Sequence, residues 1–452
     1  MKNNSNEIIN NENNISIFQG AKQNQTTQEP SKIINPNKSD SIILTEVSNK
    51  SNKRKFLFSL KNKIIFIIIY YIIIISIEFL YRDFLFTESI IIQEKIHRNK
   101  NNLLLLKISK IISLFGSEIS TLVFYGIIFL FMPFNYSFII LQSIVYAAYF
   151  TNTLKMIYQS DRPNWHSEYL TFSCNYGYGN PSGHSFTSVS LYLCLAHIFV
   201  KYFKIKDVLK ILIFAFFIIG SILIIISRVI LAAHSINQIL YGALLGLGLY
   251  FILIFIIGYH NYSCVDFYQH FKHKKIKKIY YSFHIFLLIL TVFIYIFSKD
   301  RDHTEINNKV FNNKRCEMKN DYKMYKNDGL FQALSITSIL GAQLGFDLLF
   351  TFLKIKNYMI TYSIIEWNKL KKIKHVFLRF FVIIFSSIGI IFYFIIPGNI
   401  NLILIFIFKS AFSFFLAMFG IHFIGIYLCI KLKIANREIY KMNALHEITA
   451  EA

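Results

Sequence analysis

The sequence predicts an all-α fold, a polytopic membrane helical bundle of about ten transmembrane helices built on a six-helix core. Apolar residues make up 54% of the 452 residues and charged residues only 16%, against roughly a quarter in soluble proteins. The apolar residues gather in runs close to the ~20 residues that a bilayer-crossing helix needs. This composition excludes a secreted disulfide scaffold, a disordered chain and an ordinary cytosolic enzyme.

Residues 1–57 are predicted to form a disordered, Asn-rich, cytoplasmic tail. Eleven of the first 50 residues are Asn, and such a composition buries too little apolar surface to fold. The first strongly apolar segment starts near Ile64, too far along the chain for a signal peptide. Two membrane regions are expected after the tail: residues 58–260, with six helices, and residues 261–452, with about four.

Each apolar run is interpreted as one helix, because lipid offers the backbone polar groups no other partner. The runs are apolar on all sides, so a barrel of alternating strands is disfavoured. A tight turn at Asn135-Tyr136 is expected between the second and third runs. In chain order the runs span residues 64–81, 111–134, 138–154, 185–200, 208–227, 236–259, 279–297, 330–353, 376–396 and 402–430.

The loop charges predict the orientation in the membrane. The connections after the fourth, sixth and eighth runs are rich in Lys and nearly free of acids, as cytoplasmic loops are. Both termini are therefore predicted to be cytoplasmic, although the basic loop after the first run is then placed outside. The excess of 48 Lys and Arg over 25 Asp and Glu favours the lipid bilayer as a partner, and not nucleic acid.

The five cysteines show neither CxxC pairs nor a metal-ligand spacing, so no cysteine metal site is predicted; no cofactor is expected. Cys194 and Cys429 lie inside apolar runs and are expected to pack there. Cys174 and Cys316 both fall in predicted outer loops, so a disulfide between them stays open as an alternative.

Three short polar segments interrupt the apolar pattern, and the predicted topology brings all three to the outer membrane surface. They run from Lys155 to Pro163, from Gly179 to Ser185 and from Ser227 to Gln238. Lys155, Arg162 and Arg228 supply three cations, and the same segments supply two imidazoles. Such a set of groups at one level suits a phosphate-like anion.

The residue types give each segment a chemical use. Lys155 and Arg162 are seven residues apart, which is two helical turns, so both are expected to point to one side. Arg162 and Arg228 can each present a planar fork to phosphate oxygens. Ser182 and Gly183 precede a helix start, where free N–H groups favour an anion and Gly183 allows close approach.

Two imidazoles, those of His184 and His234, remain for chemistry. One can attack phosphorus while the other protonates the leaving oxygen. Gln238 follows His234 by one helical turn, so its side-chain carbonyl can accept the proton on one ring nitrogen and leave the other nitrogen free.

These segments resemble the superfamily of type 2 phosphatidic acid phosphatases, glucose-6-phosphatases and vanadium haloperoxidases. Its pattern is Lys-x6-Arg-Pro, Pro-Ser-Gly-His and Ser-Arg-x5-His, and the chain matches every element in order, within roughly residues 110–258. The resemblance implies that the six-helix core is a phosphatase that hydrolyses a phosphate monoester through a phosphohistidine, without a metal. It implies His234 as nucleophile, His184 as general acid, and a phosphate-binding set of Lys155, Arg162, Ser182, Gly183 and Arg228.

Gln238 departs from the commonest lipid-phosphatase pattern, in which an Asp stands four residues after the nucleophile. Ala232-Ala233-His234 followed by Gln238 is more similar to glucose-6-phosphatases, with Gln238 orienting the nucleophile. We expect the endoplasmic reticulum or another endomembrane, and the loop charges place the site on the lumenal or extracellular face. The short loop from Met156 to Asn180 favours a lipid phosphate instead, so both a lipid phosphate and a sugar phosphate stay open.

Two functions of other classes also stay open. A polytopic transporter fits about ten helices with buried polar groups, although no inverted repeat is seen. A catalytically inactive lipid-binding relative fits the fold, although both histidines are present. Phosphate release by the solubilised protein separates the enzyme from both alternatives.

Overall fold

The computed structural model describes residues 37–132, 134–167, 169–170, 172, 177–258, 274–299, 373–396 and 404–425, and a few residues within 336–345 and 428–432. The chain divides into two units, residues 1–59 and residues 60–452, and side chains are described from Lys61 onward. The described residues are mostly helical and include no strand, which confirms the predicted all-α class.

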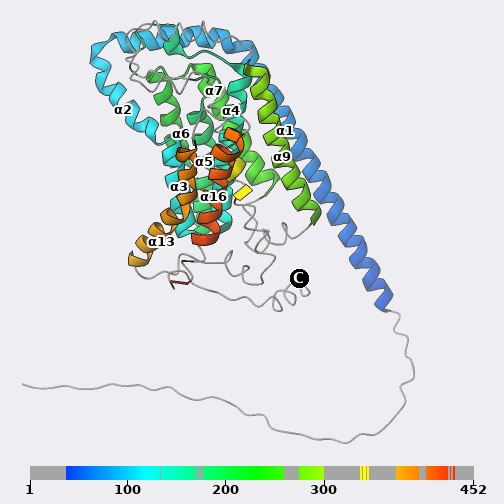
Figure 1. Ribbon diagram of the computed structural model, residues 1–452. Coiled ribbons are helices and arrows are strands. Elements are labelled where there is room, and N and C mark those ends of the chain that lie inside the picture. The colour runs from blue at the N-terminus through cyan, green and yellow to red at the C-terminus, as the bar shows by residue number, and fades with distance from the viewer. Residues whose placement is uncertain are drawn as a thin grey trace, which may run out of the picture. The chain divides into compact units, whose positions relative to one another are not determined.

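Figure 1 shows the helices in chain order, of which α1 begins in the first unit and continues into the second. The α-helices are α1 (Asn37–Arg98), α2 (Leu103–Leu114), α3 (Glu118–Phe131), α4 (Phe134–Tyr158), α5 (Gly183–Tyr202), α6 (Asp207–Ile230), α7 (Ile236–Phe251), α9 (Lys274–Lys299), α13 (Ile373–Ser386), α14 (Ile391–Ile395) and α16 (Ser413–Phe419). Short 3-10 helices are η1 (Lys100–Asn102), η2 (Pro163–Trp165) and η7 (Ser387–Ile390), and π-helical stretches are η3 (Ile252–Ile256), η8 (Ile405–Phe412) and η9 (Gly420–Gly425).

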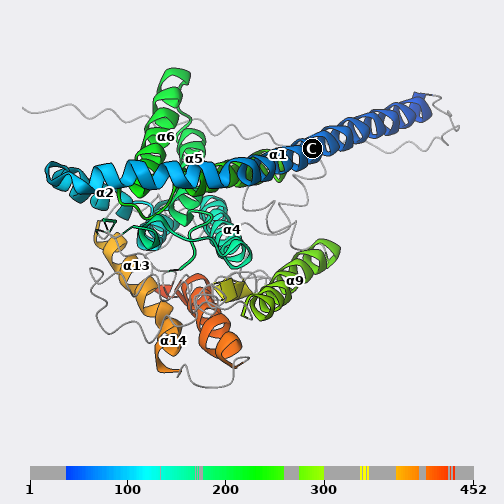
Figure 2. The same cartoon turned by 90° about the horizontal axis from the view of Figure 1, so that it is seen from above.

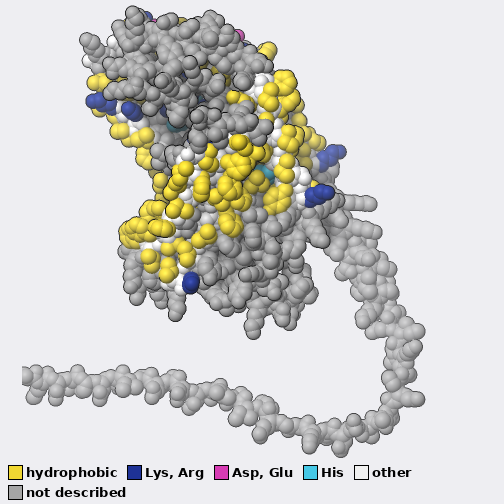
Figure 3. Space-filling model, viewed as in Figure 1, with side chains coloured by type: hydrophobic (Ala, Val, Ile, Leu, Met, Phe, Trp, Pro, Cys, Tyr) yellow, Lys and Arg dark blue, Asp and Glu magenta, His cyan; other side chains and the backbone are white. Residues whose placement is uncertain are grey.

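Six helices of the described residues are long and apolar enough to cross a membrane, which confirms the polytopic bundle. These spans are Lys61–Arg98, Tyr136–Trp165, Gly183–Tyr202, Asp207–Ile230, Ile236–Phe255 and Lys278–Phe297. The spans in α4, α5 and α7 bury more than half of the residues in their most apolar windows, whereas those in α1 and α6 bury only 11%. Hydrophobic side chains dominate the described surface in Figure 3, so α1 and α6 present the face that lipid would cover.

α1 is much longer than the predicted first run. It begins at Asn37, inside the segment predicted as a tail, and continues past Tyr81 to Arg98 through the segment predicted as a basic loop. Charged residues end the apolar run near Tyr81, but they do not end the helix. Beyond that point one face of α1 is buried against the protein, with Ser89 and Gln93 fully covered.

The predicted helix 111–134 is two helices in the structure. α2 and α3 meet at a break over residues 115–117, where the Ser117 side chain accepts a hydrogen bond from Ser120 N and caps α3. The predicted turn at Asn135-Tyr136 is wrong, because α4 already begins at Phe134. The sequence marks both breaks: Ser117 before Glu118 is a typical helix N-cap, and Pro133 comes just before the start of α4.

The later predicted runs are described only in part. The run 330–353 lies mostly outside the described residues. Cys174 and Cys316, whose pairing was left open, also lie outside them. The run 376–396 corresponds to α13, η7 and α14, and the run 402–430 contains η8, α16 and η9.

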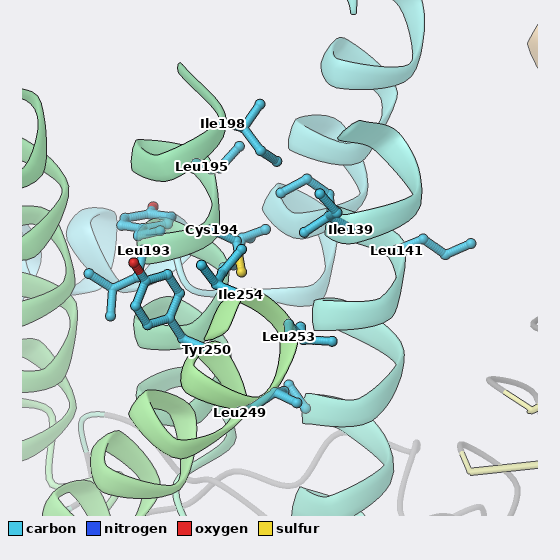
Figure 4. Packing of buried hydrophobic residues seen from close by; sticks show 14 of the residues in the cluster. Ile139, Leu141, Leu193, Cys194, Leu195, Ile198, Leu249, Tyr250, Leu253 and Ile254 are labelled. Atoms are coloured by element: carbon cyan, nitrogen blue, oxygen red, sulfur yellow. The ribbon is translucent and has the colours of Figure 1, made fainter. Parts of the chain in front are cut away.

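α5 lies at the centre of the core, packed against α4, α6 and α7 (Figures 1 and 2). Ile139 of α4, Cys194 of α5 and Leu253 of η3 are among the buried side chains that meet there (Figure 4). Gly242 allows α7 to approach α5 closely, since a Cβ there would lie 2.6 Å from the Ser182 carbonyl oxygen. This contact fixes two of the polar segments against each other.

Candidate active site

The core helices carry the three polar segments at their ends. Lys155 lies in the last turn of α4, Gly183 begins α5, Arg228 lies in the last turn of α6, and Gln238 lies in the first turn of α7. Hydrogen bonds join these ends directly, from Ser182 N to the Gln238 carbonyl and from Gln238 Nε2 to the Asp161 carbonyl. All eight residues predicted from the sequence therefore belong to helix ends, or their connecting turns, that meet in one region.

His234 lies in the turn between α6 and α7, with only 2% of its surface exposed. Its Nδ1 is 2.9 Å from the carbonyl oxygen of Gly179 and 3.2 Å from Oε1 of Gln238. Both partners can only accept, so Nδ1 carries the proton. Nε2 keeps its lone pair and lies 3.2 Å from Nη1 of Arg162, which donates to it. The ring therefore presents its nucleophilic nitrogen to a cation.

The surroundings of His234 hold its pKa well below the ordinary value of 6.5. Burial is the largest cause, because it penalises the charged imidazolium, and the positive charges of Arg162, Arg228 and Lys155 act in the same direction, followed by His184. All three predicted cations therefore act electrostatically on this imidazole. His234 is thus neutral at neutral pH, the form that a nucleophile requires.

The pH dependence of activity should report this lowered pKa. A neutral base is lost only as the pH falls through its pKa, so the His234 limb of kcat/KM is expected below pH 6.5. Gln238→Glu puts a carboxylate of the same length beside Nδ1–H, stabilises the imidazolium and should move this limb upward by about one pH unit or more. Wild type and Gln238→Glu are assayed with the same substrate, so the ionisation of the substrate affects both pH profiles equally. Coincident acid limbs would contradict the assignment.

Gln238 holds its position through both ends of its amide. Oε1 also accepts from Ser235 N at 3.3 Å, and Nε2 donates to the Asp161 carbonyl oxygen at 2.7 Å. Since the Asp161 carbonyl can only accept, the orientation of the amide is fixed, with Oε1 toward His234. Gly179 packs directly on this amide, and a Cβ there would overlap Gln238 Nε2 and lie 2.6 Å from Oε1.

Gly179→Ala should therefore displace the groups that orient His234. The added methyl would also lie 2.7 Å from the Asp161 carbonyl oxygen, so neither the amide nor its acceptor can stay in place. A misplacement of about 1 Å can cost ~10²-fold in rate, and we expect kcat to fall by that order. Gly126→Ala is the matched control, because a Cβ at Gly126 meets nothing within 4 Å; equal kcat values in the two variants would refute this reasoning.

Arg162 is buried and tied to two backbone segments. Nε donates to the Gly177 carbonyl at 2.6 Å, Nη2 to that of Tyr178 at 3.3 Å, and Nη1 to that of Ala233 at 2.8 Å. The guanidinium therefore fixes the loop before α5 against the turn of His234. The two-turn spacing to Lys155 predicted from the sequence is wrong, since α4 ends at Tyr158 and Gln159 is left-handed, with φ of 46°.

Arg228 is the second buried guanidinium, with 8% of its surface exposed. Nη1 donates to Ser113 Oγ of α2 at 2.6 Å, while Nε has no hydrogen-bond partner among the described residues. A buried N–H without a partner is costly, and an anion bound beside Arg228 would supply one. Ser113 was not predicted from the sequence, since it lies outside the three polar segments.

The start of α5 is organised by Ser182. Its side chain is the N-cap, accepting from Ser185 N at 3.4 Å and from Ser185 Oγ at 3.1 Å, and its backbone N donates to the Gln238 carbonyl at 3.0 Å. Ser182 thus joins α5 to α7 as well as standing in the predicted phosphate set. Gly183 and His184 follow as the first helical residues, where N–H groups point out of the helix.

The turn that carries His234 contains a left-handed residue other than glycine. Ala232 has φ of 53°, a conformation that costs roughly 1–2 kcal/mol for a residue with a Cβ. Ala232 N bonds the Val229 carbonyl at 2.9 Å and Ala233 N bonds that of Arg228 at 3.1 Å, which ends α6 in a Schellman turn. This turn reverses the chain so that His234 points back toward Arg162.

Two further residues at the site were missed in the sequence. Glu78 of α1 is buried, and its Oε1 accepts from Asn180 Nδ2 at 2.7 Å and from Asn237 Nδ2 at 3.1 Å. An acid inside an apolar run is a signal that could have found it. Gly116, at the break between α2 and α3, lies against the ring of His184. A Cβ added at Gly116 would be 3.3 Å from Cδ2 of His184.

Comparison with known families bears on the same residues. The family model described as the PAP2 superfamily matches residues 136–262, a segment that contains all three polar segments. The match supports assignment of this part of the chain to that superfamily, and with it a phosphatase-type activity on phosphate esters. No curated protein and no solved structure matches the chain significantly.

Proposed function

We propose that the PAP2-like segment, residues 136–262, is the catalytic part of an integral membrane phosphomonoesterase that works through a phosphohistidine at His234. The observation that carries this proposal is the neutral, buried imidazole of His234, whose Nε2 faces Arg162 while Nδ1–H is held by two carbonyl oxygens. A nitrogen nucleophile beside fixed cations is suited to attack an anionic phosphoryl group.

Substrate binding would form new hydrogen bonds with the buried guanidinium groups. The phosphoryl oxygens would accept from Nε–H of Arg228, which has no partner among the described residues, and from the Nη1–H of Arg162 that donates to His234 in the free protein. Lys155 and the N–H groups at the start of α5 would complete the set. Phosphorus would then stand in line with Nε2 of His234.

The first chemical step forms the Nε2–P bond and breaks the bond from phosphorus to the leaving oxygen. With the anionic phosphoryl group bound beside it, His184 acts in its protonated form and gives its proton to that oxygen, so the product leaves as an alcohol. Nδ1–H stays with Gly179 and Gln238 and stabilises the phosphorylated ring. In the second step neutral His184 takes a proton from water, the hydroxide attacks phosphorus, and the Nε2–P bond breaks to release phosphate.

The substrate is either a lipid phosphate or a sugar phosphate. Gln238 favours a glucose-6-phosphatase-like enzyme, since it supplies a neutral carbonyl to Nδ1 in place of a carboxylate. The buried site among membrane helices is also compatible with a lipid phosphate. We propose an endomembrane such as the endoplasmic reticulum as the location. In keeping with the loop charges, we place the site on the lumenal or extracellular face.

A substrate panel on the purified, detergent-solubilised protein tests this function. Phosphate release is measured with glucose 6-phosphate and with phosphatidic acid in mixed micelles, beside His234→Ala. A preference above about a hundredfold, ~2.7 kcal/mol of differential transition-state binding, would settle the substrate class. Absence of phosphate release from any monoester tested would contradict the proposed function and favour a transporter or an inactive relative.

A further inference from the structure

One face of the second half of α1 lies against the turn that carries His234. Ser89, Gln93 and His97 are spaced by four residues and so share this face. Gln93 Nε2 donates to the His234 carbonyl oxygen at 2.8 Å, and His97 Nε2 donates to that of Ile230 at 2.9 Å. This part of α1 crosses over the ends of α5 and α6 in Figure 2, and it lies outside the segment that matches the PAP2 superfamily.

The same face also supports the start of α7. Ser89 Oγ accepts from Ile236 N at 2.7 Å, which satisfies the first N–H of that helix, and it donates to the Leu85 carbonyl. Glu78, about three turns before Ser89 on this face, binds Asn237 and Asn180. One helix therefore holds both the segment of His234 and the residue that precedes the Pro-Ser-Gly-His segment.

Burial makes these contacts specific. Ser89 and Gln93 have no exposed surface and Glu78 only 5%, and a buried polar group is tolerated where it is hydrogen-bonded. Oε1 of Gln93 has no hydrogen-bond partner among the described residues, so its Nε2 bond to the His234 carbonyl is the contact that holds the amide. The turn itself is strained at Ala232, so its shape depends on bonds from outside. Arg162 holds the Ala233 carbonyl and Gln93 the next one, that of His234.

We propose that Gln93, assisted by Ser89 and Glu78, is a positioning residue for the His234 nucleophile. The inference rests on the proposed function, because it concerns the same imidazole. Gln93 touches neither the ring nor the phosphoryl site; it fixes the backbone from which the ring projects. Its loss should therefore slow the phosphorylation of His234 and leave phosphate binding almost unchanged.

Gln93→Met tests the proposal, since Met has similar length and volume but cannot donate to the His234 carbonyl. We expect the single-turnover rate of phosphoenzyme formation and kcat to fall by about 10- to 100-fold, with KM within about twofold of wild type. Gln93→Glu, which sets a carboxylate against that carbonyl, should be slower still. Lys95→Met, at an exposed position of the same helix, is the matched control and should behave as wild type.

The outcomes separate this inference from the proposed function. If the wild type forms phosphohistidine and folded Gln93→Met forms it at the same rate, the positioning role is wrong while the function stands. If the wild type turns over without a phosphoenzyme, the proposed function fails and the inference fails with it. Should size-exclusion chromatography show that Gln93→Met does not fold, Ser89→Ala decides, and wild-type phosphorylation by folded Ser89→Ala overturns the proposal.

Discussion

His234→Ala is expected to abolish turnover, with a loss of kcat on the order of 10⁴-fold or more. The variant removes Nε2, the atom that lies beside Arg162 and would form the bond to phosphorus. It leaves Lys155, Arg228 and the start of α5 in place, so phosphate should still bind. The measurement is phosphate release together with the affinity for inorganic phosphate.

His234→Asn is the control for the fold of the His234 variant. Its side-chain amide can still donate toward the Gly179 carbonyl and toward Gln238, as Nδ1–H does, but it offers no nucleophile. Both variants should be equally inactive although the Asn variant keeps the buried hydrogen bond. Substantial activity in either one would remove His234 from the mechanism.

His184→Asn should slow the hydrolysis of alkyl phosphates by about 10²- to 10⁴-fold, the usual contribution of a general acid. An alkoxide leaves poorly without a proton, whereas p-nitrophenolate leaves readily without one. The burst of p-nitrophenol from p-nitrophenyl phosphate should therefore fall far less than the rate with an alkyl phosphate. Gly126→Ala, which meets open space, serves as the unaffected reference.

The dependence on the leaving group distinguishes protonation from simple disruption of the site. If His184 only supported the fold of the α5 start, both substrates would lose activity to the same extent. Equal losses in the burst phase would therefore contradict the acid role and leave His184 as a packing residue beside Gly116.

Hydropathy predicted the apolar helices well, because lipid exposure demands long apolar runs. It missed the continuation of α1 to Arg98, since that part has charged residues on one side and a buried polar face on the other. The buried polar face of α1 depends on tertiary contacts that a sequence window does not contain. The break at Gly116 was also missed, although Ser117 and Glu118 mark it as a helix start.

The motif spacing indicated which residues meet, but not how each one is held. Gln238 was expected beside His234, and its Oε1 lies 3.2 Å from Nδ1. The Gly179 carbonyl, the nearer acceptor at 2.9 Å, comes from a loop whose path is set by Arg162 and could not be predicted from spacing. Arg162 lies beyond the end of α4 and after Gln159, which is left-handed. Its position relative to Lys155 therefore could not be predicted from helical spacing.

Identification of the phosphorylated atom tests the central claim most directly. Wild-type protein is quenched during turnover with ³²P-labelled substrate, and the label is mapped by peptide analysis and by its acid lability and base stability. We predict a single phosphohistidine, at His234 and on Nε2, because Nδ1–H is held by the Gly179 carbonyl and Gln238. Label on Nδ1 or on another residue, or active turnover with no trapped label, would contradict the account.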